Sequence, residues 1–393
     1  MVLQTGISDP LSYTFYPMAR WLAQPLIVLS CLAALCAPST LQAQEVVTEQ
    51  VHLLKAKVLE VLAEDEVVEP WSGLTSPTQT IRIEVLEGAE KGQVVTIEND
   101  YTQLKEGQTF YVRHAFGGFD AETWSVADPY RLDVLIGVAV AFVLLLFAFG
   151  GIQGIRGLAS LLGSLVLIFY LLIPNIFLGH SPVLVSIGVS SLIIVIGSYI
   201  THGFNRTTTI AMFGMLATVL ITGIATYFVI DAAQLTGFTT EENAYLNFGT
   251  QGRIDMIGLL FGGIMIGLLG VLYDIAIGQA ITVEELAAAG VHYSKKQVLA
   301  RGMRVGREHI GALVNTLAIA YVGASLPLLL LFQHSGAGVA YIINSELFAT
   351  EIIRILMGSI GLVLAVPITT VLATYLLYGK VPHRTSEHHG HKH

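Results

Sequence analysis

Long apolar runs dominate the chain after its first third. Seven of them are long enough to cross the hydrocarbon layer of a bilayer, which takes about 20 helical residues. They lie at about 132–150, 157–178, 182–201, 207–231, 254–281, 309–332 and 351–378. This pattern predicts a mainly α-helical membrane bundle of about seven transmembrane helices.

Apolar and polar residues alternate between residues 44 and 131. Stretches with a period of two lie at 51–62, 80–88, 92–99 and 108–116, and Gly, Pro and charged clusters separate them. Such a pattern is typical of short strands joined by turns. We therefore predict four or five strands in a small antiparallel β-barrel, similar to the oligonucleotide-binding (OB) type.

Residues 1–43 have the order of a secretory signal peptide. An arginine precedes the apolar stretch 22–35, and small residues end at Ala43. Residues 1–17 carry no positive charge, so Met18 is an alternative start. The other interpretation is a first transmembrane helix, although the stretch is short for a span of about 20 residues.

Composition supports the membrane class. The 393 residues are 53% apolar and 12% charged, which is too apolar for an ordinary soluble domain. The acidity is concentrated in residues 44–131, where 7 Lys/Arg oppose 16 Asp/Glu, a balance of 7 − 16 = −9. This balance disfavours nucleic acid as a partner. Both cysteines, Cys31 and Cys36, precede this segment, so we expect no disulfide or cysteine–metal site after it.

Basic residues are unevenly distributed between the loops. With the β domain outside, the outer loops 179–181, 232–253 and 333–350 carry only Arg253. The inner segments carry Arg156, Arg206, Lys295, Lys296, Arg301, Arg304, Arg307, Lys380, Arg384 and Lys392. The positive-inside rule then predicts a plasma-membrane protein with an extracytoplasmic N-terminal domain and a cytoplasmic C-terminus.

The inner loop 282–308 has its own helix signals. A Glu-rich turn ends at Gly290, and Ser294 to Gln297 match a capping box. We predict two short helices at the membrane face. They are either a basic anchor on anionic lipid or a regulatory or binding element.

One carboxylate lies inside an apolar run. Asp274 falls in the fifth predicted span and shares a helical face with Gly263, Gly267, Gly270 and Gly278. A charge at this depth costs about 2.5–3.5 kcal/mol on insertion scales, so it needs a partner, a proton or water. Because small residues mark close helix packing, we predict that Asp274 points at protein. The seventh span has a similar packing face, which includes Gly358 and Gly361.

Amide and hydroxyl groups of the sixth and seventh spans reach the depth of this carboxylate, roughly 10 Å below the inner surface at about 1.5 Å per residue. The predicted polar layer consists of Asp274, Asn315, Thr316, Thr369 and Thr370. It is either an ion, proton or substrate site on a pathway or a set of interhelical hydrogen bonds. For Asp274 we favour the site, because a carboxylate is a poor choice for packing alone.

The C-terminal tail is rich in histidine. His383, His388, His389, His391 and His393 could hold zinc, copper or nickel, but without a fixed geometry. The chain has no Walker loop and no HExxH, GxSxG or dinucleotide fingerprint. We therefore expect neither an enzyme nor a bound cofactor.

Several stretches resemble the YibE/F-like family of bacterial membrane proteins. They lie at 95–99, 156–165, 203–214, 258–286, 301–332 and 343–370. Asp274 and the run Asn315-Thr316-Leu317 stand where that family commonly shows an acidic residue and an Asn-Thr-Leu run. The resemblance implies a multi-pass plasma-membrane protein with an N-terminal extracytoplasmic domain. It implies no substrate.

Two functional hypotheses follow. In the first, the chain is a secondary transporter or permease, and an unknown small ion or solute engages Asp274. In the second, it is a non-transporting scaffold or sensing component, whose outer β domain recruits a protein partner. In both, the lipid bilayer is the surrounding medium.

Overall fold

The computed structural model describes residues 50–68, 73–116, 122–289 and 292–379. The chain divides into two compact units, residues 1–137 and 138–393, which we describe separately. The predicted signal peptide and the histidine-rich tail lie outside the described residues.

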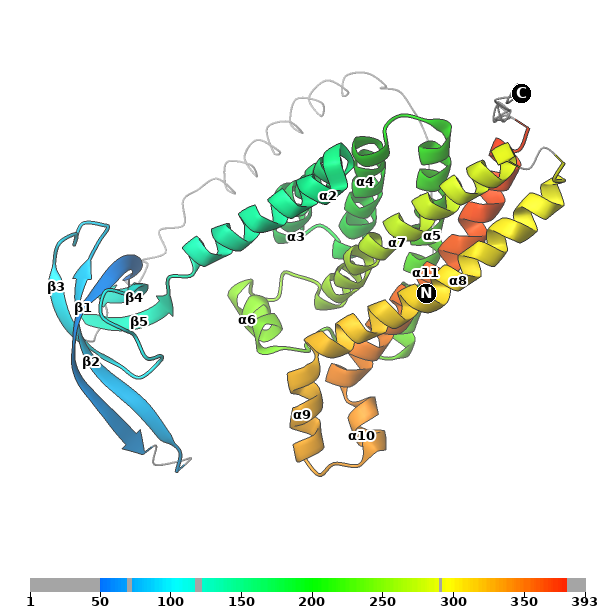
Figure 1. Ribbon diagram of the computed structural model, residues 1–393. Coiled ribbons are helices and arrows are strands. Elements are labelled where there is room, and N and C mark those ends of the chain that lie inside the picture. The colour runs from blue at the N-terminus through cyan, green and yellow to red at the C-terminus, as the bar shows by residue number, and fades with distance from the viewer. Residues whose placement is uncertain (1–49, 69–72, 117–121, 290–291, 380–393) are drawn as a thin grey trace, which may run out of the picture. The chain divides into compact units, whose positions relative to one another are not determined.

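An antiparallel sheet of five strands forms the first unit, in the order β3-β2-β1-β4-β5 (Figure 1). The strands are β1 (Gln50–Val68), β2 (Thr75–Val85), β3 (Val94–Asn99), β4 (Thr109–Phe116) and β5 (Thr123–Pro129). The first four overlap the stretches predicted from the alternating pattern. The prediction of four or five antiparallel strands is therefore confirmed.

The long strand β1 joins the two halves of the sheet. Residues 50–57 pair with β4, and residues 56–68 pair with β2. Two register shifts, after Val58 and after Val61, bend the strand where the partner changes. In the described part of the chain, the edge strands β3 and β5 do not pair with each other, so the sheet of the predicted barrel is not closed. Alternation specifies one buried face per strand, whereas closure also requires the two edges to meet in register.

A buried amide network holds the edge of this sheet. The side chain of Gln79, which is 3% exposed, accepts hydrogen bonds from the backbone N–H of Leu104 at 2.7 Å and from Nδ2 of Asn99 at 3.2 Å. Its Nε2 donates to Oε1 of Glu64 at 2.9 Å and to the carbonyl of Leu104 at 3.2 Å. Nδ2 of Asn99 also donates to the carbonyl of Thr102 at 2.6 Å. One side chain therefore ties β1, β2, β3 and the loop before β4 together.

The second unit is helical. Its elements are α2 (Leu132–Leu167), the π-helix η1 (Ile168–Leu172), α3 (Ile173–Phe177), α4 (Pro182–His202), α5 (Arg206–Ala232), α6 (Glu241–Gly249), α7 (Met256–Ala289), α8 (Lys295–Ala324), α9 (Leu326–His334), α10 (Val339–Asn344) and α11 (Glu346–Leu377). The helical bundle predicted from the apolar runs is therefore confirmed in outline, and α2 leads into it from the end of the first unit.

The described residues contain five helical segments long and apolar enough to cross a membrane, or six if α8 and α9 form one span. The first two predicted spans are one candidate, Leu132–Phe177, in which two helices meet at a kink at Gly151 (φ 54°, ψ −144°). The sixth predicted span is broken between α8 and α9, which are bent by 61° relative to each other. These features make the chain a membrane-embedded protein with five or six candidate spans.

The predicted short helices at residues 282–308 are wrong. Instead, α7 continues to Ala289, and α8 begins at Lys295. Both long helices extend past the apolar runs because the intervening residues, such as the stretch EELAAA, are good helix formers. The predicted capping box is confirmed, since Ser294 and Gln297 exchange side-chain and backbone hydrogen bonds at 3.3 and 2.8 Å.

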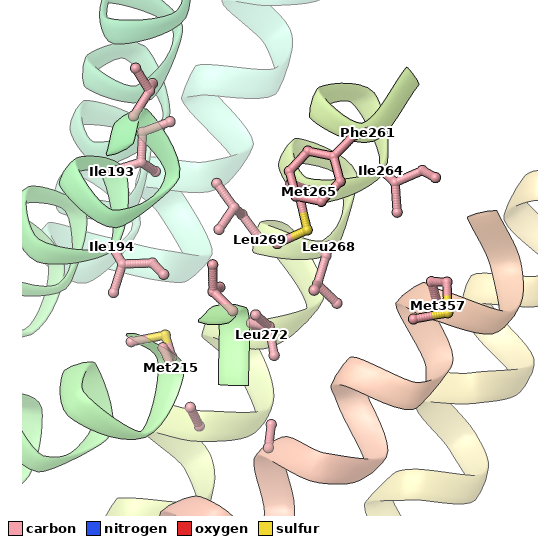
Figure 2. Packing of buried hydrophobic residues seen from close by; sticks show 14 of the residues in the cluster. Ile193, Ile194, Met215, Phe261, Ile264, Met265, Leu268, Leu269, Leu272 and Met357 are labelled. Carbon is pink, nitrogen blue, oxygen red and sulfur yellow. The ribbon is translucent and has the colours of Figure 1, made fainter. Parts of the chain in front are cut away.

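The core of the helical unit lies around α7, which contacts α4, α5, α8 and α11. Figure 2 shows Phe261, Met265 and Leu269 of α7 among side chains from the neighbouring helices, including Ile193 and Met357. Because lipid chains are as apolar as these residues, tight packing stabilises the helix contacts more than water exclusion does.

Small residues set the closest helix approaches. A Cβ built on Gly214 of α5 would lie 2.5 Å from Oγ1 and 3.3 Å from Cα of Thr369 on α11. A Cβ built on Gly361 of α11 would lie 3.2 Å from Oγ1 of Thr222 on α5. From the Gly214–Thr369 contact to the Thr222–Gly361 contact, the residue number rises by 222 − 214 = 8 on α5 and falls by 369 − 361 = 8 on α11. The two helices are therefore antiparallel and nearly in backbone contact.

We expect Gln79→Leu to destabilise the sheet by about 1–3 kcal/mol, because it leaves the buried Leu104 N–H and Asn99 amide without their acceptor. Urea unfolding of the full chain in detergent, followed by tryptophan fluorescence, measures this change, since Trp21, Trp71 and Trp124 all precede the helical unit. The exposed residue Gln93 offers a matched control in Gln93→Leu. Equal unfolding midpoints for the two variants would contradict the structural role of Gln79.

We expect Gly214→Leu to separate α5 from α11, because its side chain would meet the backbone of Thr369. Overpacking of this kind costs about 1–3 kcal/mol or more. Gly263→Leu is the control, since nothing lies within 4 Å of a Cβ at that position. The thermal midpoint of helical circular dichroism in detergent should fall for the first variant only, and a similar loss in both would contradict the close contact.

Candidate functional site

Asp274 lies on the side of α7 that the core leaves open. Its side chain is exposed, whereas the next residues, Ile275 and Ala276, are buried in the bundle. The carboxylate lines an open cavity of about 650 Å³ within the helical unit. Among the described residues, no donor forms a hydrogen bond with it. The acid group is therefore in a cavity and is not sealed among neighbouring donors.

The helices α2, α4 and α7 and the π-helix η1 contribute the walls of this cavity. The polar lining residues are Ser160 and Ser164 of α2, Thr201 and His202 of α4, and Tyr273 and Asp274 of α7. The remaining lining residues are Gly157, Leu161, Leu165, Ile168, Ile193, Ile266, Leu269, Gly270 and Ile277. The cavity is thus mainly apolar, with a few polar groups that converge from different helices, as is typical of binding sites for small ligands.

Tyr273 fixes α7 against α4 beside the carboxylate. Its hydroxyl donates to the carbonyls of Ile193 at 2.6 Å and Ile194 at 2.9 Å. Gly197 makes room for this contact, because a Cβ there would collide with the Tyr273 hydroxyl and would lie 2.8 Å from Oγ of Ser160. The approach of α2, α4 and α7 at one point forms the base from which Asp274 projects.

A hydrogen bond joins the α2 wall to the end of α4. Nε2 of Gln153 donates to the carbonyl of Thr201 at 3.0 Å. Ser164 turns its hydroxyl toward its own helix and donates to the carbonyl of Ser160 at 2.9 Å. The hydroxyl oxygens of both serines therefore stay available as acceptors on the cavity side.

An unpaired carboxylate in mainly apolar surroundings can take a proton or bind a cation. Carboxylate, hydroxyl and carbonyl oxygens are the ligands that hard cations prefer. The arrangement thus fits a cation or protonatable solute better than an anion.

The five residues of the predicted polar layer do not form one cluster. Asn315 and Thr316 are exposed on α8, and the Thr316 hydroxyl donates to the carbonyl of Ala312 at 3.0 Å. Thr369 and Thr370 are fully buried in the core. No hydrogen bond among the described residues joins any two members of the layer. A shared depth fixes the height of a side chain along the bundle but not the direction in which it points.

The glycines predicted to pack divide into two groups. Gly358 lies against Leu317, and Gly361 lies against Leu268, with built Cβ distances of 3.0 and 2.8 Å. Gly267 approaches the Tyr321 hydroxyl, with a corresponding distance of 2.7 Å. Gly263, Gly270 and Gly278 have no described atom within 4 Å of a Cβ, so their packing role stays a prediction. These three glycines of α7 therefore lie on its open face, whereas Gly267 of the same stripe is in contact with α8.

Several polar residues of the helical unit escaped the sequence analysis. His202, Thr201, Ser160 and Ser164 line the cavity but stand in short polar interruptions that look like ordinary helix ends or packing positions. Gln279, which is 1% exposed, donates to the carbonyl of Gly302 at 2.7 Å. The sequence did contain a signal for Gln279, because an amide side chain inside an apolar run is unusual, as a carboxylate is.

A metal centre has no support from the described residues, which contain no group of three or more His, Cys, Asp or Glu that could hold an ion. The histidines predicted as weak metal ligands, His388, His389, His391 and His393, lie outside the described residues.

Comparison with known proteins gives one match. Residues 138–379 match the sequence model of the family described as YibE/F-like protein. A search of curated proteins and a search of solved structures each found no match to the chain. The matched range covers more than half of the chain and includes the whole cavity.

We expect a membrane-impermeant maleimide to label Ser164→Cys rapidly in detergent, because this position lines the open cavity. Thr369→Cys should stay unlabelled until the protein is denatured, because Thr369 is fully buried. Both variants are made with Cys31 and Cys36 replaced by Ser, and mass spectrometry measures the labelled fraction. Equal labelling of the two native variants would contradict a solvent-reachable cavity.

Proposed function

The chain belongs to the YibE/F-like family, and from this premise we propose that it is a secondary transporter or permease of the bacterial plasma membrane. In this proposal, a small ion or solute engages Asp274 in the cavity between α2, α4 and α7. The observation that carries the proposal is the exposed, unpaired carboxylate at the wall of a cavity of about 650 Å³. A carboxylate used only to join helices would be expected to have a donor beside it.

Helix directions support an alternating membrane topology. Ser186 of α4 lies against Gly262 of α7, and Tyr273 lies against Gly197. Both numbers rise by eleven (197 − 186 and 273 − 262), so α4 and α7 run in the same direction. With α5 antiparallel to α11, these directions agree with spans that cross the membrane alternately.

We propose seven spans, with a break at Gly151 dividing the first candidate in two. A continuous helix of 46 residues would be about 70 Å long at about 1.5 Å per residue, more than twice the hydrocarbon thickness of about 30 Å. The positive-inside rule then puts the start of α5 and the α7–α8 connection in the cytoplasm. The N-terminal sheet would be extracytoplasmic, behind a cleaved signal peptide.

For the first unit we propose an OB-like, partly open barrel. The long β1 pairs with β2 along one part and with β4 along the other, and β3 and β5 are the two edges. An OB fold is itself a partly open five-stranded barrel. Its acidic charge disfavours nucleic acid and suits a protein or cationic partner.

A non-transporting scaffold or sensing component is the second candidate. It is favoured by the open face of α7, where Gly263, Gly270 and Gly278 have no described neighbour within 4 Å of a Cβ. A second helix could pack closely on such a face. In this case the outer sheet would recruit a protein partner. Neither candidate assigns catalysis or a cofactor to the chain.

We expect Asp274→Asn to reduce proton or cation flux to the rate of protein-free liposomes, because the amide cannot exchange a proton or neutralise a cation. Purified protein is reconstituted with pyranine inside for protons, or with a cation indicator, and flux is measured under an imposed gradient. Asp133→Asn is the control, because Asp133 stands in the first turn of α2 and lines none of the cavities described here.

Parent-like flux in a folded Asp274→Asn protein would refute the cavity as the transport site. A parent protein that shows no flux of protons, cations or tested solutes would favour the scaffold.

A further inference from the structure

A second, smaller cavity opens where α4 ends and α5 begins. Its volume is about 310 Å³. Its lining residues are His202, Asn205, Thr207, Thr208, Ile277, Ile281 and Glu284. Since α4 ends at His202 and α5 begins at Arg206, this cavity lies at the end of the bundle that the proposed topology exposes to the cytoplasm.

The two cavities share part of their walls. His202 and Ile277 line both the small cavity and the larger cavity that contains Asp274. The imidazole of His202 is partly buried between them. Glu284 follows Asp274 by ten residues on α7, a rise of roughly 15 Å. Asp274 and Glu284 thus lie at the two ends of a path through the joined cavities, and His202 lies where the cavities meet.

Glu284 is fixed at the mouth of the small cavity. The hydroxyl of Thr207 donates to its Oε2 at 2.7 Å. Thr207 lies in the first turn of α5, where Asn205 caps the helix by accepting from the backbone N–H of Thr208 at 2.7 Å. Helix N-termini stabilise negative charge, so this position suits a carboxylate.

We propose that Glu284 and His202 form a proton relay between the aqueous phase and Asp274, which makes the proton the ion that this site exchanges. The relay rests on the proposed function of the Asp274 cavity and specifies its ion and its route of access. An imidazole suits the middle position, because it accepts and donates protons near neutral pH.

Each step moves one proton and leaves the other bonds unchanged. The Glu284 carboxylate takes a proton from a hydronium ion, which becomes water, and Glu284 becomes neutral. It passes the proton to the ring nitrogen of neutral His202, which becomes an imidazolium ion as Glu284 regains its charge. The imidazolium then protonates the Asp274 carboxylate, so His202 is again neutral and Asp274 carries the proton.

Water can complete the path. Both cavities are much larger than the share of about 30 Å³ that one water molecule occupies in the liquid. The titratable residues that line the two cavities are His202, Tyr273, Asp274 and Glu284. The hydroxyl of Tyr273 already donates to two carbonyls of α4, so the relay passes it by.

The test measures proton flux into pyranine-loaded proteoliposomes that contain the full chain. We expect His202→Gln and Glu284→Gln to slow flux by about tenfold or more, within the range of general acid–base effects. Imidazole in the buffer should restore flux to His202→Gln, because a free imidazole can occupy the cavity and carry the proton. Glu284→Asp should retain flux, because it keeps a carboxylate.

His309→Gln and Glu308→Gln are the matched controls, since both residues are exposed on α8 and line neither cavity. Thermal midpoints of all variants are compared with the parent to detect misfolding. Loss of flux in His202→Gln without rescue by imidazole would overturn the relay and leave a structural role for the ring.

The outcomes separate the relay from the proposed function. If Asp274→Asn abolishes flux while both relay variants transport like the parent, the relay is overturned and the transport site stands. If the parent moves another cation without protons, the relay is again overturned alone. If Asp274→Asn keeps parent-like flux, the proposed function fails and the relay, which ends at that carboxylate, fails with it.

Discussion

The helical unit depends on close packing around one side of α7. In a bilayer, the surrounding lipid is as apolar as the helix surfaces, so helices associate through fitted contacts and interhelical hydrogen bonds. The α5–α11 pair shows how such contacts arise, since Gly214 meets Thr369 and Gly361 meets Thr222. These small residues let backbones approach, and α7 fills the remaining space with Phe261, Met265 and Leu269 (Figure 2).

Two buried hydroxyls of this packed core bond within their own helices. Thr218 donates to the carbonyl of Gly214 at 2.8 Å, and Thr370 donates to the carbonyl of Val366 at 2.6 Å. Such bonds satisfy the hydroxyl without a partner across the interface. A carboxylate has no proton to donate when it is ionised, and Asp274 accordingly lies outside the packed core.

The sequence predicted the periodicity of strands and helices better than the direction in which individual side chains point. Alternation located β1 to β4, and Ser294 with Gln297 located the start of α8, because these signals are local. The closure of the sheet and the directions of the polar side chains depend on partners that local patterns do not specify. The spacing of Gly263, Gly267, Gly270 and Asp274 put them on one face of α7, and all four are exposed in the structure, although Gly267 also approaches Tyr321 of α8.

The two sides of α7 differ in how closely other helices pack against them, and this difference bears on the proposed transport. On one side, the four helices α4, α5, α8 and α11 contact α7. On the other side lies α2, which the structure describes in full and in which no residue is buried. The α2 wall of the cavity is therefore its least firmly held side, joined to the end of α4 by the hydrogen bond from Gln153 to Thr201. Transporters alternate access by moving one group of helices against a more rigid one. In the proposed transporter, α4 and α7, which carry His202 and Asp274, would form the rigid group. The loosely held α2 that faces them would be the group that moves.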